Sequence, residues 1–304
     1  MHASHPGPLL ARATLDRAAH VRSDPEALLR LWADPRARVL RVDAGTAPRS
    51  GEGLAYSDPT VLDGAGAADP DRRYFLGVDP DGVPYFALDG PFPPAAGETA
   101  VALRRIGPWL PARDSGLFVH AVALAAWHGR HRFCPACGGP TTPAAGGHSR
   151  TCAGCGAVQF PRLDPAVIML VVDGDDRALL AHNTAWPEGR VSTLAGFVEA
   201  GESAEQAVVR EVLEEVGLVV DRVDYEGSQP WPFPSSLMLA FRARAGDPVL
   251  RVDRTEITEA RWFTRAELLR AVDRRQTLLP SAVSIARWQV ERWYGGPLPT
   301  EHDW

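Results

Sequence analysis

The sequence predicts an α+β or α/β sandwich in its C-terminal half, preceded by a small metal-binding segment and an N-terminal mixed α/β domain. Three observations support this. After Phe160, apolar runs of strand length alternate with an amphipathic helix. Two Cys-x2-Cys pairs precede that pattern, and the first 130 residues combine a hairpin pattern with a helix pattern. We therefore expect domains at 1–130, 131–158 and 159–295, with a C-terminal tail at 296–304.

Composition is that of an ordinary globular protein. The 304 residues are 45% hydrophobic and carry a net charge of −6, which gives no overall basic field for nucleic acid or anionic membrane. Every strongly basic side chain is arginine, which excludes a Schiff-base lysine and a Walker-type phosphate lysine. The apolar runs Ala121–Trp127 and Ala166–Val172 are far shorter than the roughly 20 residues of a membrane span. Four charged residues between positions 12 and 22 interrupt any signal-peptide core, so we expect a cytoplasmic protein with no membrane partner.

Two elements are expected in the N-terminal domain. Strands at Tyr74–Val78 and Val83–Leu88 flank the turn sequence Asp79–Gly82 and predict a hairpin. Apolar residues at helical spacing predict a helix from about Ser115 to His128.

The four cysteines, Cys134, Cys137, Cys152 and Cys155, form two Cys-x2-Cys pairs separated by fourteen residues. This spacing is typical of a zinc ribbon with four thiolate ligands, and a cytoplasmic chain favours metal binding over disulfides. Four protein ligands close the coordination shell, so one structural Zn²⁺ per chain is expected. Unrelated thiols, two disulfides and direct nucleic-acid binding by the ribbon are the alternatives.

The C-terminal half contains four expected strands and two expected helices. One helix lies within the segment Gly196–Leu218. The other elements are strands at Ala166–Val172, Arg177–Ala181, Val191–Ala195 and Leu237–Ala243, and a helix at Ser281–Trp293.

The segment GFVEAGESAEQAVVREVLEEVGL places three glutamates on one turn of the first helix. Ser203 and Gln206 form a capping-box sequence, and Gly217 suits the residue after the helix. A helical wheel places Val208, Val209, Val212, Leu213 and Val216 on one side and Glu211, Glu214 and Glu215 on the opposite arc. Like charges at this spacing repel unless a cation lies among them, and carboxylate ligands favour Mg²⁺ or Mn²⁺. A solvated acidic helix face is the alternative.

Together with Gly196, Glu202, Arg210 and Gly217, these glutamates resemble the Nudix box at all of its defining positions. We expect Glu202 to pair with Arg210. The resemblance implies a Nudix α/β/α sandwich that hydrolyses nucleoside diphosphates linked to a second group. It also implies that Glu211, Glu214 and Glu215 bind the cations, that Glu214 or Glu215 activates the attacking water, and that the backbone carbonyl of Ala195 is a further metal ligand.

The segment Ser228–Met238, SQPWPFPSSLM, is similar to the SQPWPFPxS sequence of the NADH pyrophosphatase family. Members of this family also have a zinc ribbon immediately before the Nudix domain. Without that context, the segment could be a packed proline-rich turn carrying aromatic rings. The resemblance implies that the following residues contact the substrate: Arg104, Phe160, Phe197, Gln229, Pro230, Trp231, Pro232, Phe233, Pro234, Ser235, Ser236, Glu256 and Ala286. Glu256 would also complete the metal site, and Phe160 stands where the family usually has tyrosine.

These features predict hydrolysis of the pyrophosphate of NADH or NAD⁺ to nicotinamide mononucleotide and AMP. The resemblance also implies removal of NAD caps from RNA 5′ ends and a homodimer. A broader Nudix hydrolase acting on ADP-ribose, a nucleotide-sensing regulator and a zinc-ribbon RNA-binding module are the alternative functions. The base, the preferred metal and the physiological substrate remain open at this point.

Overall fold

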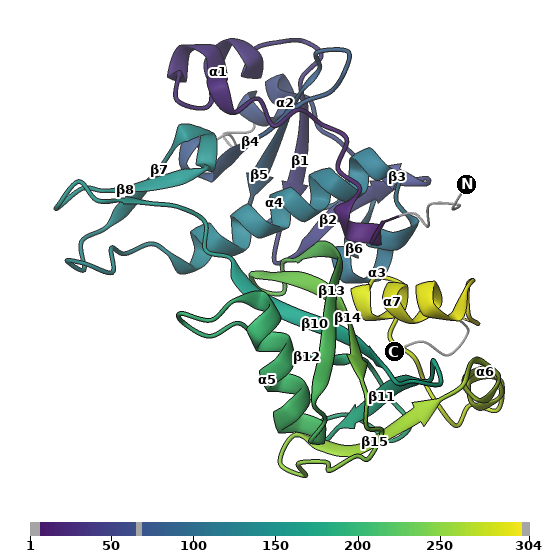
Figure 1. The fold of residues 1–304 in the computed structure, drawn as a ribbon. Coiled ribbons are helices and arrows are strands. Elements are labelled where there is room, and N and C mark those ends of the chain that lie inside the picture. Colours follow the sequence, from purple (N-terminus) through teal and green to yellow (C-terminus); the bar gives the residue numbers. More distant parts are fainter. Residues whose placement is uncertain (1–6, 65–68, 300–304) are drawn as a thin grey trace. The chain divides into compact units, whose positions relative to one another are not determined.

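The computed structural model describes residues 7–64 and 69–299, and these form two compact units (Figure 1). The N-terminal unit comprises Arg12–Leu163 and the short segment Trp231–Ser235. Of the described residues, the C-terminal unit comprises 7–11, 164–230 and 236–299. The four cysteines of the expected zinc ribbon therefore belong to the same unit as the segment that begins at Arg12, while the glutamate helix belongs to the other unit. The finer division expected at residues 130, 158 and 295 stays a prediction.

The N-terminal unit contains three three-stranded sheets. One has the order β1-β5-β4, with β1 and β5 parallel; the others, β3-β2-β6 and β7-β8-β9, are antiparallel. The strands are β1 Arg38–Val42, β2 Thr46–Ser50, β3 Gly53–Leu54, β4 Arg73–Val78, β5 Pro84–Asp89, β6 Thr99–Ala102, β7 Thr141–Ala144, β8 Ser149–Cys152 and β9 Val158–Gln159. The helices are α1 Pro25–Trp32, α2 Pro59–Gly64, α3 Leu103–Ile106 and α4 Ala112–Arg130, with short 3₁₀ turns at Ala19–Val21, Pro70–Arg72, Gly107–Trp109 and Ala145–Gly147.

Both predicted elements of this unit are confirmed. Strands β4 and β5 pair antiparallel, and the Asp79 carboxylate accepts hydrogen bonds from the turn backbone of Asp81 and Val83. The predicted helix is α4, which extends beyond the expected bounds at both ends. Helix α4 packs against β1 and β4, so its apolar residues complete the core of the unit.

The C-terminal unit is built on a six-stranded sheet with the order β13-β14-β10-β11-β15, in which β12 also pairs with β10. The long central strands β10 and β14 are parallel, and β12, β11 and β15 join by antiparallel pairing. The strands are β10 Asp164–Val172, β11 Ala178–Asn183, β12 Leu194–Phe197, β13 Val220–Trp231, β14 Ser236–Ala245 and β15 Ile257–Phe263. The helices are α5 Ala204–Val216, α6 Arg265–Asp273 and α7 Ile285–Tyr294, and Leu9–Ala11 forms a 3₁₀ turn.

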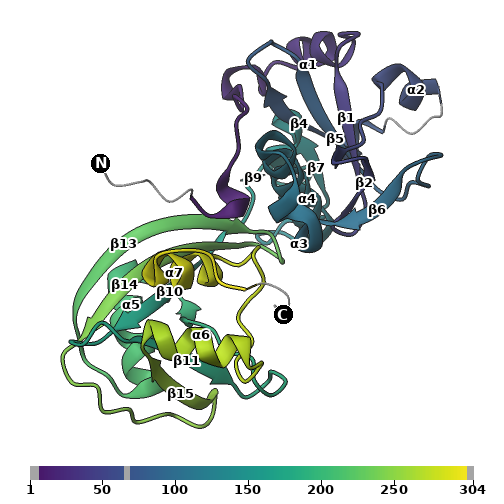
Figure 2. The same ribbon diagram turned by 90° about the vertical axis from the view of Figure 1, so that its right-hand side faces the viewer.

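Helices cover both faces of this sheet (Figures 1 and 2). Alternate residues of β10 point to opposite faces: Val167 and Met169 pack in the core under α5, while Leu170 and Val172 pack in the core under α6 and α7. The buried amide of Gln289 in α7 donates to the carbonyls of Ile168 and Phe241, which fixes α7 on the sheet. These layers confirm the predicted α/β/α sandwich.

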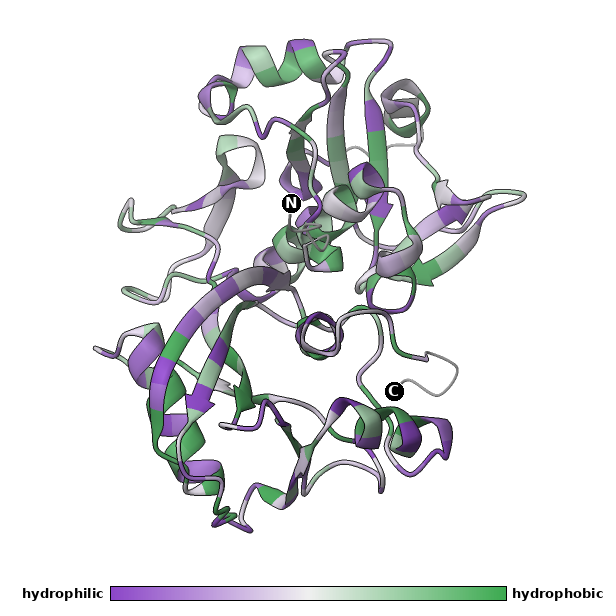
Figure 3. Ribbon diagram, turned by 45° about the vertical axis from the view of Figure 1, so that its right-hand side comes forward, coloured by the Kyte–Doolittle hydropathy of each residue, from purple (hydrophilic) through white to green (hydrophobic). Residues whose placement is uncertain are grey.

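Helix α5 begins and ends as predicted. Ser203 and Gln206 form the reciprocal capping box, and Gly217 takes a left-handed conformation with φ 70°. Hydrophilic and apolar residues alternate along the helix (Figure 3).

The predicted division of the α5 faces is wrong in part. Val208, Val212 and Val216 are fully buried, but Val209 and Leu213 are 41% and 50% exposed. At about 100° per residue, Val209 and Leu213 lie roughly 100° and 140° from Val208, whereas Glu215 lies only about 20° from it. Glu215 therefore sits at the edge of the apolar face and is only 7% exposed.

Strands β13 and β15 and helix α6 were not expected from the sequence. Strand β13 carries charged residues at Asp221, Arg222, Asp224 and Glu226. Its sequence therefore lacks the run of apolar residues by which the other strands were predicted. The proline-rich segment Ser228–Met238 begins inside β13 and ends inside β14, so only its central residues form a turn. Within the described residues, no helix is both long and apolar enough to cross a membrane.

Candidate active site and zinc centre

Glu215 is the most deeply placed carboxylate of the α5 cluster. Burial, followed by the negative charges of Glu211, Glu256 and Glu214 in that order, raises its pKa to about 8. Its Oε2 atom is buried and accepts no hydrogen bond among the described residues. An uncompensated carboxylate of this kind is costly in a folded protein, and a cation would remove the cost.

Glu211 packs directly against the backbone of β12. A Cβ atom placed on Gly196 would lie 1.8 Å from Glu211 Oε1, so only glycine leaves room for this carboxylate. Burial raises the pKa of Glu211, while the neighbouring Arg210 guanidinium lowers it. The glycine thus gives the acidic helix close access to the strand that carries Ala195.

Arg210 holds the acidic cluster to the preceding loop. It forms two hydrogen bonds with Glu202, at 2.8 and 2.9 Å, as predicted. It also donates to Glu211 at 2.8 Å, to Glu214 at 3.1 Å and to the carbonyl of Phe197 at 2.9 Å. The last three contacts were not predicted, although the four-residue spacing of Arg210 and Glu214 is a recognised signal for a helical ion pair.

Glu256 approaches the cluster from another part of the sheet. It precedes β15, and its carbonyl accepts a hydrogen bond from Thr184 N at 2.9 Å. Its charge contributes to the raised pKa values of both Glu211 and Glu215. Ala195 is exposed on β12, opposite Ile168 of β10. The fold therefore brings the sequence-predicted metal residues into one region of the C-terminal unit.

This donor set suits a divalent cation. Carboxylate oxygens are the ligands that hard cations prefer, and at least four acidic groups perturb one another here. A cation in the cluster would partner the buried oxygen of Glu215 and would offset the effect of burial, which raises the pKa of Glu211.

The four cysteines form the second centre. Their Sγ atoms all lie within 4.8 Å of one another, with Cys134 and Cys152 buried and Cys137 and Cys155 exposed. Gly138 and Gly156 have left-handed backbones with φ 72° and donate their N–H groups to the carbonyls of Cys134 and Cys152. The Cys155 backbone N–H lowers the pKa of Cys152 to about 6, which favours the thiolate. This geometry is that of a closed zinc knuckle pair.

The aromatic segment forms the tip between β13 and β14 and lies in the N-terminal unit. The rings of Trp231 and Phe233 meet edge to face, with centroids 5.0 Å apart. The Arg104 guanidinium carbon lies 5.4 Å from the Trp231 ring centroid and 5.9 Å from that of Phe233. The structure thus brings Arg104 to the aromatic segment, as part of a cation–π group.

Family models match the chain over two adjoining regions. The NUDIX domain matches residues 162–282, and the NADH pyrophosphatase zinc ribbon domain matches residues 130–160. The NAD-capped RNA hydrolase NudC of Mycobacterium bovis (strain BCG / Pasteur 1173P2) is 44% identical over 304 residues, covering 94% of this chain and 94% of that protein.

This chain belongs to the NADH pyrophosphatase family of Nudix hydrolases.

Other relatives agree with this family. The NudC protein of Mycobacterium tuberculosis (strain ATCC 25618 / H37Rv) shows the same identity and coverage. The human NAD-capped RNA hydrolase NUDT12 is 39% identical over 193 residues, covering 60% of this chain and 42% of that protein.

Two residues expected to contact the substrate of this Nudix hydrolase form hydrogen bonds within the chain. Gln229 is fully buried; its Oε1 accepts from Leu10 N at 3.2 Å and its Nε2 donates to Val283 O at 3.0 Å. Ala286 is 1% exposed, and its N–H donates to the Ser284 hydroxyl that caps α7. Both side chains are thus buried in internal contacts, and the assignment of Gln229 and Ala286 to the substrate site stays a prediction.

The other expected substrate residues are more accessible. Phe160 and Phe197 are 71% and 59% exposed, in the N-terminal and C-terminal units respectively. Pro232 is buried, Phe233 half-buried and Pro234 exposed, while Pro230, Trp231, Ser235 and Ser236 are half-buried. Exposed aromatic rings are available for stacking on planar ligands.

Proposed function

We propose that this enzyme hydrolyses the pyrophosphate bond of NADH and NAD⁺ to nicotinamide mononucleotide and AMP, and removes NAD caps from RNA 5′ ends. One observation carries the proposal: the complete α5 carboxylate cluster lies in a chain that is 44% identical to an NAD-capped RNA hydrolase over nearly its full length. A regulator that only senses nucleotides does not require such a costly set of acidic groups.

We propose Glu211, Glu214, Glu215, Glu256 and the carbonyl of Ala195 as the residues that hold Mg²⁺ or Mn²⁺. When bound, these cations offset the charge of the pyrophosphate and lower the pKa of the attacking water. Arg210 fixes the positions of Glu211 and Glu214, and the packing of Glu215 against the apolar face restricts its rotamers. The carboxylates are therefore positioned before the substrate binds.

Glu214 and Glu215 differ in a way that bears on the identity of the base. The Glu214 side chain is 58% exposed and accepts a hydrogen bond from Arg210, whereas Glu215 is buried and lacks one. Glu214→Gln and Glu215→Gln variants, titrated with Mg²⁺, separate the two roles. Loss of the base lowers kcat at saturating metal, whereas loss of a ligand raises the metal concentration needed for half-maximal rate.

We propose that Phe160, Phe197, Glu256, Arg104 and the segment Pro230–Ser236 contact the dinucleotide. An aromatic ring can stack on nicotinamide or adenine, and an arginine can bind phosphate. The rival, a general hydrolase of ADP-ribose, requires no contact with nicotinamide.

The deciding experiment compares purified enzyme on NADH, NAD⁺, ADP-ribose and an NAD-capped RNA, each with Mg²⁺ or Mn²⁺. We expect kcat/KM for NADH or capped RNA to exceed that for ADP-ribose by at least about tenfold, or about 1.4 kcal/mol of transition-state discrimination. Equal values for NADH and ADP-ribose would contradict the assignment.

We further propose a cytoplasmic homodimer. The reduced four-cysteine cluster favours a reducing compartment, since such cysteines hold metal rather than form disulfides. Light scattering coupled to gel filtration tests the dimer, and a mass of 32.9 kDa at micromolar concentration would exclude it.

A further inference from the structure

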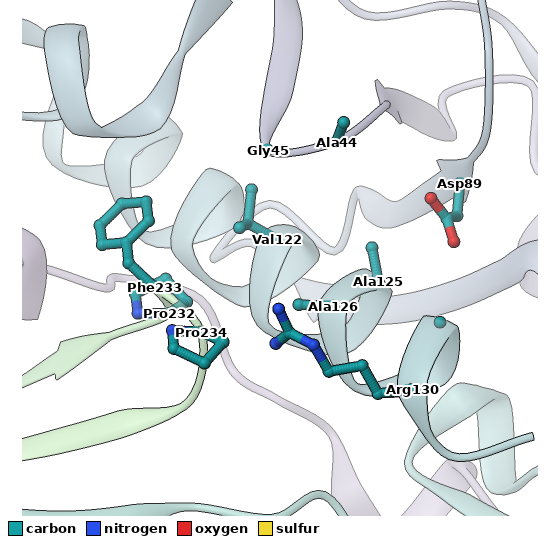
Figure 4. A pocket seen from close by; sticks show the side chains of 11 residues that line it. Ala44, Gly45, Asp89, Val122, Ala125, Ala126, Arg130, Pro232, Phe233 and Pro234 are labelled. Atoms are coloured by element: carbon teal, nitrogen blue, oxygen red, sulfur yellow. The ribbon is translucent and has the colours of Figure 1, made fainter.

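The cavity shown in Figure 4 lies in the N-terminal unit and is lined in part by Pro232, Phe233 and Pro234, which already belong to the proposed dinucleotide site. A second cavity of this unit has a volume of about 350 Å³ and shares no lining residue with the first. Its walls come from α1 and the residues before it, from β4 and β5, and from the segment 143–147, which leads from β7 to β8. This volume is at the lower end of the range of roughly 300–1,000 Å³ that small-molecule sites occupy.

The second cavity lies between the zinc ribbon and the N-terminal sheet. The segment 143–147 stands between the two cysteine pairs in the sequence, whereas Phe75 and Phe86 belong to the sheet β1-β5-β4. Ligand sites are common where two structural parts of a protein meet. The His148 Nε2 atom donates a hydrogen bond to the Phe75 carbonyl at 2.8 Å, which fixes the end of this segment on β4.

The backbone of the turn Ala145–Gly147 is strained. Its three residues all have left-handed conformations, with φ 49°, 59° and 88°. A Cβ atom placed on Gly146 would lie 3.1 Å from Phe75 Cβ and 3.4 Å from Leu28 Cδ1, so glycine lets the turn pack closely on β4 and α1. A left-handed alanine is costly, and such strain is found where a turn or a site requires it.

The walls of the cavity are mainly apolar. Phe75 and Phe86 form its buried part, and their ring centroids lie 5.2 Å apart. On the α1 side, Leu28 is half-buried and Leu29 is 62% exposed; on the ribbon side, Pro143 is half-buried. A ligand with an apolar body would remove the exposed parts of these side chains from water.

The lining contains three charged groups, Arg22, Arg73 and Asp71. Two arginines and one carboxylate leave one positive charge unbalanced. The Arg73 guanidinium carbon lies 3.7 Å from the centroid of the Trp32 ring, so this cation is already held in a cation–π contact. Arg22 donates to the carbonyl of Arg17 at 2.9 and 3.2 Å and, within the described part of the chain, forms no ion pair with a carboxylate. Arg22 is therefore the group best suited to bind an anion.

The charges around Arg22 also favour an anion. Burial and the charge of Arg17 lower the pKa of Arg22 by more than a nearby carboxylate raises it. Asp24 and Glu26 lie outside the lining, and both pair with Arg30, at 3.8 and 3.7 Å. A bound monoanion would thus offset the local excess of positive charge.

We propose that this cavity binds a small organic carboxylate with an apolar body, its carboxylate at Arg22 and its body between Leu28 and Pro143. A purely apolar ligand would leave Arg22 without a counter-charge, and a cationic ligand would be repelled by both arginines. A dianion such as inorganic phosphate would exceed the single unbalanced charge and leave the apolar walls uncovered. The ligand would join the ribbon to the sheet, because each contributes a wall of the cavity.

The probe is 3-phenylpropionate, measured by saturation-transfer NMR with the zinc-loaded full chain. It combines one carboxylate with a compact apolar body, and we expect a dissociation constant of about 1 mM or lower. Two analogues separate the contributions: 3-phenylpropanol lacks the charge, and acetate lacks the apolar body. Each should bind at least about tenfold more weakly than the probe. Equal affinities of the acid and the alcohol would overturn the proposal.

Arg22→Gln should weaken binding of 3-phenylpropionate about tenfold or more and leave binding of 3-phenylpropanol unchanged, since only the acid uses the positive charge. Arg38→Gln is the matched control. Arg38 of β1 is exposed, donates to a backbone carbonyl as Arg22 does, and does not line the cavity. The control should bind the probe as the wild type does.

Ala144→Phe tests the position of the apolar body. Ala144 is the last residue of β7 and has an extended backbone that phenylalanine favours, so the added ring would occupy the cavity. We expect it to weaken binding of the probe at least about tenfold. Thr142→Phe, exposed on the same strand and outside the lining, is the control. Melting temperatures close to that of the wild type show that both variants are folded.

Binding at another place gives a different pattern. Wild-type affinity for the probe in both Arg22→Gln and Ala144→Phe overturns the proposal, and loss of binding in Arg104→Ala would then place the probe at the aromatic segment. Hydrogen exchange gives a second measurement. The probe should slow amide exchange in the segment 143–149 but not in α5, and unchanged exchange in that segment would contradict the ribbon wall of the site. Neither measurement involves hydrolysis, so both outcomes are independent of the proposed function.

Discussion

Single side chains of α5 determine the electrostatic state of the candidate active site. Glu215 is buried beside Val208 and Val212, and three other carboxylates raise its pKa. A buried acid without a hydrogen-bond partner destabilises a fold, so its presence here indicates a functional requirement. A cation bound beside Glu215 would offset the free-energy cost of burying this carboxyl group.

Glu215→Gln should abolish most hydrolysis and stabilise the metal-free protein. We expect kcat for NADH to fall by roughly 10²-fold or more, because a group that binds metal or activates water is lost. The melting temperature without divalent cation should rise, because a buried acid is replaced by a neutral amide. Glu205→Gln, on the exposed first turn of α5, serves as the control. Full activity in Glu215→Gln would refute the proposed mechanism.

Gly196→Ala should damage activity much more than stability. The added Cβ would displace the end of the Glu211 side chain, which lies 1.8 Å from that position, while the backbone can stay in place. A shift of about 1 Å in a catalytic group can cost as much as 10²-fold in rate. Steady-state kinetics and thermal unfolding of this variant and of Gly174→Ala provide the comparison. Equal kcat values in the two variants would show that Glu211 does not need its observed position.

Elements are joined in the N-terminal unit by buried histidines. His128 of α4 accepts a hydrogen bond from Arg150 at 2.7 Å and donates to the carbonyl of Gly147 at 2.8 Å. His148 bonds to the carbonyl of Phe75 on β4 at 2.8 Å. Burial lowers the pKa of both histidines to about 4, so both are neutral when folded. These contacts attach the ribbon segment to α4 and β4.

Stability should therefore fall as pH decreases from about 6.5 to 4. In this window the unfolded chain binds protons at His128 that the folded chain does not, so protonation favours unfolding. The stabilisation is fully present above pH 6.5 and is lost as pH falls toward the folded pKa. Replacing His128 with glutamine should reduce the loss by at most about 3 kcal/mol. Urea unfolding at several pH values measures the free energy of unfolding, with the exposed His20→Gln as control. Identical pH slopes of this free energy for the His128 variant and the wild type would contradict a neutral, buried His128.

At the scale of the whole molecule, the two sets of candidate metal ligands lie in two different units. The zinc cysteines lie in the N-terminal unit, whereas the α5 carboxylates lie in the C-terminal unit. Thiolates prefer softer ions than carboxylates do, so one chelator can separate the two sites.

A zinc-selective chelator should unfold the ribbon region without removing Mg²⁺. We expect about one zinc per chain by elemental analysis, and a lower melting temperature after chelation because zinc binding contributes to folding free energy. Cys152→Ser should reproduce this change. If the chelated protein keeps its zinc-loaded melting temperature, the cluster does not have a structural role.

The sequence determined the parts whose chemistry depends on local spacing. The capping box of α5, the Glu202–Arg210 pair and the four cysteines all follow from residues close in sequence, and the structure places them as expected. Only the tertiary structure decided which side chains are buried away from solvent. It buried Glu215 and Gln229, exposed Val209 and Leu213, formed β13 from a charged segment and opened a cavity beside α4. Burial depends on partners distant in sequence, and desolvation by those partners sets the pKa and the role of each group.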